Sequence, residues 1–229
     1  MVNKSKRINP PFWQHDFFVL KRLYGLLKII ANYIPPNSII IDYGCGNAPY
    51  ENLFNIRPNR YLKVDIGKNK IADIHIKEDM PLPLKNNFAD VILSTQVLEH
   101  VNNVDLYLRE CQRILKKKGS LILSTHGLWP FHPSPGDFQR FTAPGLKLLI
   151  KKYDFRTLKF FPILGPFASV TEYTLLLLAN RLAGKNILGR LILAVFSLVG
   201  NLIIFIEDKF WPVSKNSDAS LYLIWAEKK

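Results

Sequence analysis

The sequence is poor in cysteine and in acidic residues. Its 2 cysteines, Cys45 and Cys111, are too few for a cysteine metal cluster or a disulfide framework, which indicates a reducing compartment. No set of metal ligands is expected. Asp and Glu number 18 against 31 Lys and Arg, a formal net charge of +13. Such an excess predicts an anionic partner or surface, either nucleic acid or an anionic membrane, unless it serves solubility alone.

A secretory signal is also missing. The opening residues, MVNKSKRINPPF, are basic but have neither an apolar core nor a cleavage site, so the protein is expected to be cytoplasmic. A hydrophobic content of 48% with 21% charged residues is typical of a globular chain. The length of 229 residues suits one domain over residues 1–229.

A third glycine is absent from the turn around which the chain is organised. Residues 39–50, IIIDYGCGNAPY, predict a buried strand, a sharp turn at Gly44 and Gly46, and the start of a helix at Pro49. Glycine lets a ligand lie directly against the main chain. A dinucleotide fingerprint needs glycine where Pro49 stands, so a pyrophosphate site is disfavoured. The alternative is a tight turn without a ligand.

An acid follows at an informative distance. Residues 61–66, YLKVDI, predict a second strand, and Asp65 lies about twenty residues beyond the glycines. At this distance a βαβ unit returns a carboxylate to the ribose of a bound nucleotide, where it can accept hydrogen bonds from both hydroxyls.

Two motifs carry a family resemblance. Asp42, Gly44 and Gly46 fit the pattern [DE]-x-G-x-G-x-G, with Ala48 in place of its last glycine. Residues 77–101, KEDMPLPLKNNFADVILSTQVLEHV, follow the pattern D-x-x-x-P-L-P-[FL]-x-[DN]-x-[FS]-F-D-x-V, then a strand, then L-E-H, and the residues in step are Pro81, Leu82, Pro83, Phe88, Asp90, Val91, Leu98, Glu99 and His100. Both motifs resemble those of class I S-adenosylmethionine-dependent methyltransferases with a type 11-like methyltransferase domain.

The resemblance implies S-adenosyl-L-methionine as the cofactor. Lys77 stands where the family usually has an acid near the adenine, so Glu78 or Asp79 is expected to replace it. The end of the fourth strand is expected to meet the methionine part of the cofactor. The implied cofactor contacts are Asp42, Gly44, Gly46, Asp65, Asp79, Ser94 and Gln96.

The predicted fold is α/β and Rossmann-like: a doubly wound, seven-stranded, mostly parallel sheet with an antiparallel last strand. An amphipathic N-terminal helix is expected within residues 10–34, and a helical apolar insertion within residues 165–212, before the last strand. Further strands are expected near residues 71–76, 91–96 and 219–228, and further helices near residues 49–56, 103–116 and 143–152.

The acceptor side is expected in the irregular segment of residues 128–146, because long irregular loops in compact domains are usually functional. This segment resembles the H-x-x-P-x-D-[FY]-x-R-[FY]-T pattern of one methyltransferase group. His126 and His132 are the candidate catalytic bases. Asp137 and Arg140 either pair to hold the loop or contact the substrate, and His100 is expected to be structural.

Residues 167–211 are unusually apolar. The run from Leu191 to Ile206 has 16 residues, fewer than the roughly 20 that a membrane-spanning helix needs. A single span would also separate the last strand from its sheet. Two helices joined near Gly184 are therefore expected, forming a buried cap, a dimer surface or a site of attachment to an anionic membrane.

The predicted activity is methyl transfer to a small-molecule or lipid-linked acceptor, such as a sugar, quinone-like or polyprenyl-linked compound, at the inner face of a membrane. An RNA methyltransferase is the second hypothesis, ranked lower because the sequence has no added RNA-binding module and no Asn-Pro-Pro-Phe/Tyr motif. The third is an inactive cofactor-binding scaffold, suggested by Ala48 and Lys77. A homodimer is considered possible.

Overall fold

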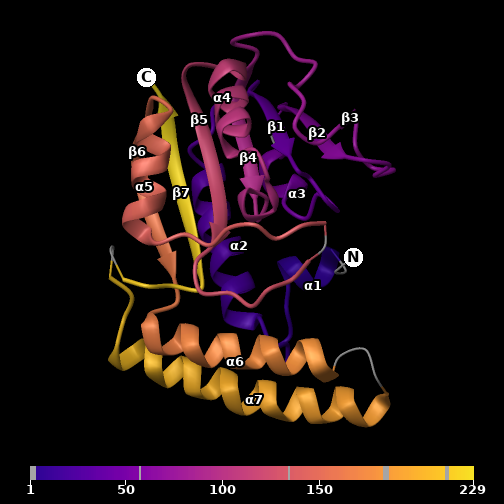
Figure 1. Cartoon of the computed structure of the whole chain (residues 1–229), viewed down its shortest axis with the longest axis vertical. Coiled ribbons are helices and arrows are strands. Elements are labelled where there is room, and N and C mark those ends of the chain that lie inside the picture. Colours follow the sequence, from indigo (N-terminus) through magenta and orange to yellow (C-terminus); the bar gives the residue numbers. More distant parts are fainter. Residues whose placement is uncertain (1–3, 57, 134, 183–185, 215–216) are drawn as a thin grey trace.

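The protein folds around one seven-stranded sheet (Figure 1). The computed structural model describes residues 4–56, 58–133, 135–182, 186–214 and 217–229. The strand order is β3-β2-β1-β4-β5-β7-β6, with β7 antiparallel to both of its neighbours and the other pairings parallel. The predicted fold class is thus confirmed. The strands are β1 (Ile39–Tyr43), β2 (Arg60–Ile66), β3 (Ile74–Ile76), β4 (Ala89–Thr95), β5 (Leu115–His126), β6 (Phe155–Ile163) and β7 (Leu221–Lys228).

Helices cover both faces of the sheet. Leu108 of α4 and Leu146 of α5 pack with the sheet in one apolar cluster, whereas Leu23 of α2, Phe54 of α3 and Leu175 of α6 pack in another. The helices are α1 (Lys4–Ile8), α2 (Phe17–Ala31), α3 (Glu51–Phe54), α4 (Val104–Ile114), α5 (Ala143–Lys152), α6 (Pro166–Leu182) and α7 (Ile187–Phe210), with a 3₁₀ turn η1 (Leu98–His100).

The strand order fixes where a ligand can bind. From β1 the chain proceeds to β2 on one side, whereas β4 lies on the other, so the connections after β1 and β4 diverge and leave a crevice beyond their carboxyl ends. The two motifs noted in the sequence include the carboxyl ends of these two strands. The strand order therefore brings them together.

The apolar insertion forms two long helices that lie side by side, with α7 outermost (Figure 1). They pack closely: a Cβ added at Gly200 of α7 would lie 2.7 Å from Cδ2 of Leu175 on α6. The expected junction near Gly184 lies outside the described residues. With 24 residues, α7 is longer than the 16-residue run considered in the sequence, so the expectation that it is too short to cross a membrane is wrong.

Polar contacts fasten α7 to the N-terminal segment. The Asn201 side chain is fully buried, and its Nδ2 donates to the carbonyl oxygens of Phe12 at 2.6 Å and Gln14 at 2.9 Å. Near the end of α7, Nη1 of Arg22 on α2 donates to Asp208 at 2.8 Å. These contacts hold α7 in register with the domain.

We expect Asn201→Ala to lower the free energy of unfolding by about 1–3 kcal/mol, because two carbonyl groups lose their donor. Urea denaturation followed by circular dichroism measures this change. Leu202→Ala is the matched control, since that side chain is 55% exposed and should change stability by about 0.5 kcal/mol or less. Equal effects of the two substitutions would contradict the assignment of the anchor to Asn201.

Candidate functional site

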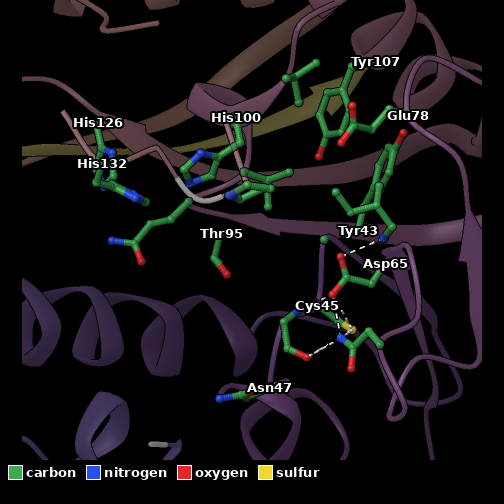
Figure 2. A pocket seen from close by; sticks show the side chains of 18 of the residues that line it. Tyr43, Cys45, Asn47, Asp65, Glu78, Thr95, His100, Tyr107, His126 and His132 are labelled. Atoms are coloured by element: carbon green, nitrogen blue, oxygen red, sulfur yellow. Dashed lines mark hydrogen bonds between the residues drawn. The ribbon is translucent and has the colours of Figure 1, made fainter. Parts of the chain in front are cut away.

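A cavity of about 910 Å³ opens beyond the carboxyl ends of the parallel strands. Its wall includes Gly44 and Gly46 after β1, Asp65 near the end of β2, Gln96 after β4 and His126 at the end of β5. Figure 2 shows Cys45 and Asp65 on one side of the cavity and a group of histidines on another. The volume lies near the top of the range of about 300–1,000 Å³ usual for ligand sites, which leaves room for two ligands.

The glycine turn exposes its main chain to this cavity. Gly44 has φ +79°, and a Cβ there would lie 2.5 Å from Cγ2 of Val97. Gly46 has φ +52°, and a Cβ there would meet nothing within 4 Å. Ala48, at the position where a last glycine is usual, is buried with φ 44°, a left-handed conformation that costs alanine more than glycine. The turn therefore keeps the shape that the motif requires despite Ala48.

Asp65 holds this turn and also lines the cavity. Its Oδ2 accepts hydrogen bonds from the backbone N–H of Gly46 at 3.1 Å and from Nδ2 of Asn69 at 2.6 Å, and its Oδ1 accepts from the N–H of Ile66 at 2.9 Å. A carboxylate oxygen can accept more than one hydrogen bond, so Asp65 keeps capacity for a hydroxyl of the ligand.

Two of the predicted cofactor contacts need correction. The Asp42 side chain is buried behind the turn, where its Oδ2 accepts from the Tyr61 hydroxyl at 2.6 Å, and burial raises the pKa of Asp42 to about 7. The Ser94 hydroxyl is fully buried and lies 2.8 Å from the hydroxyl of Tyr107. Neither residue is in the cavity wall, because both precede the end of their strands and point into the packed layers.

The expected adenine end is formed by three consecutive residues. Lys77, Glu78 and Asp79 all line the cavity. Although Lys77 stands where the family usually has an acid, the next two residues therefore still supply carboxylates to the cavity wall. Asp79 has φ 53° and accepts a hydrogen bond from Nδ2 of Asn102 at 3.3 Å.

Three histidines gather at the other end of the cavity. The ring centroid of His132 lies 5.7 Å from that of His126 and 4.7 Å from that of His100, and all three residues line the wall. His100, expected to be structural, thus also borders the site, while its Nδ1 lies within hydrogen-bonding distance of the Gly136 carbonyl oxygen. Burial lowers the pKa values of His126 and His132, so both rings are neutral near pH 7.

Glu99 is a member of this group that sequence reasoning missed. Its carboxyl group is fully buried, and its Oε2 accepts a hydrogen bond from the Thr125 hydroxyl at 2.9 Å. Its Oε1 lies 3.2 Å from Nδ1 of His126. Burial raises the pKa of Glu99 to about 7. The only signal for Glu99 in the sequence was its place in the L-E-H motif, directly before His100.

The irregular loop wraps around these buried groups. The N–H of Phe138 donates to the carbonyl of Glu99, and the His126 ring stacks on Trp129 with centroids 4.4 Å apart. Nη2 of Arg140 donates to Asp137 at 2.6 Å, and although burial works to raise the pKa of Asp137, these hydrogen bonds lower it to about 2. The Asp137–Arg140 pair therefore holds the loop, which is the first of the two roles that the sequence suggested for these residues.

Elements distant in sequence close the cavity. Arg7, His15 and Asp16 of the N-terminal region and Leu176 and Asn180 of α6 belong to its wall. No spacing rule predicted these residues, because they depend on how the insertion packs. Among the described residues, no group of three or more His, Cys, Asp or Glu side chains is placed to hold a metal ion.

Comparison with known proteins agrees with this geometry. Residues 41–123 match the family described as "Methyltransferase domain". A probable S-adenosylmethionine-dependent methyltransferase of Mycobacterium tuberculosis is 28% identical over 105 residues, which are 41% of this chain and 38% of that protein. A ubiquinone biosynthesis O-methyltransferase of Pelagibacter ubique is 29% identical over 151 residues, 54% and 63% of the two chains. The chain thus spans less than two thirds of either relative.

Solved structures show the same fold. A putative sarcosine dimethylglycine methyltransferase from Galdieria sulphuraria aligns with a TM-score of 0.58 at 15% identity, over 91% of this chain and 85% of that one. The [4+2]-cyclase SpnF aligns with a TM-score of 0.59 at 16% identity, over 91% and 81%. Fold and site together define a Rossmann-like α/β domain with a ligand cavity at the carboxyl ends of its parallel strands. The match over residues 41–123 and the similarity to methyltransferases support the assignment of this part of the chain to a class I S-adenosylmethionine-dependent methyltransferase domain.

The two glycines provide a matched test of the cofactor site. Gly46→Ala should lower the melting temperature only modestly, because the new Cβ meets nothing within 4 Å and the cost is that of a left-handed alanine at φ +52°, about 1–2 kcal/mol. It should reduce affinity for S-adenosyl-L-methionine at least about tenfold, because the methyl group enters the cavity. Gly44→Ala should lower the melting temperature further, because its Cβ also lies 2.5 Å from Cγ2 of Val97. Thermal denaturation and isothermal titration separate these effects, and unchanged affinity of the Gly46 variant would argue against the site.

Proposed function

We propose that this protein transfers a methyl group from S-adenosyl-L-methionine to a small-molecule or lipid-linked acceptor. The observation that carries the proposal is one cavity with the glycine turn and Asp65 on one side and His100, His126 and His132 on another. When bound, the cofactor supplies a methyl group activated on a sulfonium sulfur. The protein then mainly has to position the acceptor, since alignment of the reacting atoms supplies much of the rate.

We propose that Gly44, Gly46, Asp65, Asp79 and Gln96 hold the cofactor. Main chain at the two glycines would lie against it, and the remaining lone pair on Oδ1 of Asp65 would accept from a ribose hydroxyl. Gln96 is fixed by its own main chain, whose N–H donates to the carbonyl oxygen of Ser124 at 2.9 Å, and its side chain borders the cavity.

His126 is the proposed base for a hydroxyl acceptor, with His132 as the alternative. Glu99 acts as a positioning residue: its Oε1 lies 3.2 Å from Nδ1 of His126, where a carboxylate favours the tautomer with the proton on Nδ1, and this leaves Nε2 with a free lone pair for the proton of the acceptor. Stacking on Trp129 keeps the ring in this orientation. As the acceptor oxygen gains the methyl group and loses its proton to Nε2, the carboxylate of Glu99 stabilises the imidazolium that forms.

The setting proposed for this activity is the inner face of a membrane, with residues 1–229 acting as one cytoplasmic methyltransferase domain. The apolar insertion supports this setting, because α6 contributes Leu176 and Asn180 to the cavity wall. Nucleic acid is a less favoured acceptor, and a cofactor-binding scaffold without activity is the other alternative. A homodimer is compatible with the proposal.

Cofactor binding and transfer can be tested separately. Isothermal titration should show micromolar or tighter binding of S-adenosyl-L-methionine and of its demethylated product, and Asp65→Ala should weaken both at least about tenfold because the ribose loses its acceptor. Incubation of cell extract with the protein and methyl-labelled cofactor should then label the lipid or the small-molecule pool. Label in RNA would favour the second hypothesis, and binding without label the scaffold.

The role of Glu99 gives a pH prediction once an acceptor pool is labelled. Below pH 7 the protonated carboxyl of Glu99 donates to Nδ1 and forces the proton of neutral His126 onto Nε2, so turnover should rise with pH through about 7. Glu99→Gln cannot ionise and should abolish this rise while leaving cofactor affinity unchanged. The initial rate of label transfer from pH 5.5 to 8.5 is the measurement.

His126→Asn and His132→Asn are the matched pair for this assay. Loss of the base should reduce the rate by about 10²–10⁴-fold. A loss confined to His132→Asn would transfer the role to that residue, and full activity of both variants would mean that the acceptor needs no base from these rings.

A further inference from the structure

The outer surface of α7 is apolar where a helix on a water-exposed surface should be polar. Gly189, Leu193, Ser197, Gly200 and Ile204 are the buried residues that recur every three or four positions. They form one narrow face, with Gly200 packed on α6. On an ordinary amphipathic helix the opposite face carries charged and polar side chains.

Here the opposite face carries Leu191, Val195, Leu198 and Leu202, whose exposed fractions are 60%, 60%, 43% and 55%. At 100° per residue these four form one stripe diametrically opposite the buried face. Other large apolar side chains that α7 exposes on either side of this stripe include Leu188, Phe196, Val199, Ile203, Phe205 and Ile206. So large a contiguous apolar surface marks an interaction site.

The charges around this surface indicate which partner it meets. Among the described residues of α6 and α7, the acids are buried or paired: Glu172 is buried, Glu207 accepts from Thr171, and Asp208 pairs with Arg22. The cations Arg181 and Arg190 are exposed, as is Lys209 at the end of α7. An apolar stripe flanked only by exposed positive charge matches the acyl chains and anionic headgroups of a lipid surface.

Aromatic side chains add to the match. Trp211 directly after α7 is 55% exposed, and Trp13 is 59% exposed beside Phe12, whose carbonyl oxygen accepts from Asn201. Tryptophan is enriched at the boundary between acyl chains and headgroups, where its ring is apolar and its N–H remains hydrated.

The chain path determines how α7 can meet a bilayer. By length and composition this helix could cross a membrane, although 33% of its most apolar window is buried. However, α6 precedes it and packs along it, and β7 follows it into the sheet between β5 and β6. Crossing would break these contacts, whereas lying flat keeps them and exposes only the outer stripe to lipid.

We propose that α7 docks flat on an anionic membrane through the stripe Leu191, Val195, Leu198 and Leu202. This inference deepens the proposed function, on which it rests for the acceptor. Leu176 and Asn180 of α6 line the cavity, and packed helices lie about 8–10 Å apart, so docking brings the cavity wall within one helix layer of the lipid. The acceptor class that fits is a lipid-linked molecule whose reactive group reaches the cavity from the bilayer.

The test is co-flotation of the full chain with vesicles of phosphatidylglycerol and phosphatidylcholine, compared with vesicles of phosphatidylcholine alone. The wild type should float with the anionic vesicles at low salt and less so as salt rises. Replacing the four stripe residues together by Gln should weaken partitioning by about 100-fold or more, because four apolar side chains no longer enter lipid. Arg181→Gln, Arg190→Gln and Lys209→Gln together should reduce the preference for anionic lipid.

The matched control replaces Ile29, Ile56, Ile71 and Leu148 by Gln. These side chains are 44–76% exposed, similar to the 43–60% of the four stripe residues. Because they lie outside α7, their replacement should leave partitioning of the protein onto vesicles unchanged. Equal loss in both quadruple variants would overturn the proposal, as would failure of the wild type to float with any vesicle.

Sedimentation equilibrium without lipid tests whether the stripe on α7 binds a second copy of this chain instead of a membrane. The membrane assignment would be overturned if the wild type were a dimer, the stripe variant were a monomer, and neither protein bound vesicles. Affinity for S-adenosyl-L-methionine should be the same in the wild type and both quadruple variants. A wild type that binds no vesicle but binds the cofactor and transfers methyl groups would therefore refute this inference and leave the proposed function standing.

Discussion

The hydrogen bond from the N–H of Gly46 to Asp65 is the constraint on which the site depends. It joins the turn after β1 to the residue near the end of β2, so two neighbouring parallel strands fix the position of one short stretch of bare main chain. The N–H groups of Gly44 and Cys45 both donate to the Val64 carbonyl, which strengthens the same connection. Because the left-handed turn is tied at both ends, its shape does not depend on a third glycine.

The histidine end of the cavity is organised differently, by burial of ionisable groups. Glu99 and His126 come from η1 and from the end of β5, and the irregular loop closes over both. Burial makes the charged form of each group costly, which raises the pKa of the acid and lowers that of the base. Burial therefore keeps the His126 ring neutral and able to accept a proton, a property suited to acid–base chemistry.

The insertion links these two ends to the outside of the molecule. Its inner helix, α6, contributes to the cavity wall, and its outer helix, α7, is fastened by Asn201 and Asp208 to the N-terminal region that forms another part of that wall. The insertion thus gives a common fold a cavity wall of its own. Relatives with the same sheet differ in the molecules they act on. In the proposed function the strands and the glycine turn would hold the cofactor, and the added helices would determine which acceptor reaches it.

The sequence by itself determined the sheet, the glycine turn and Asp65, because these depend on local patterns: apolar strand runs, positive φ at Gly44 and Gly46, and the fixed length of a βαβ unit. It misplaced the side chains of Asp42 and Ser94, since a motif does not say which way a strand residue faces. Only the tertiary structure decided that Glu99 meets His126 and that α7 turns an apolar face outward. Those relations join segments far apart in the chain, and packing alone sets them.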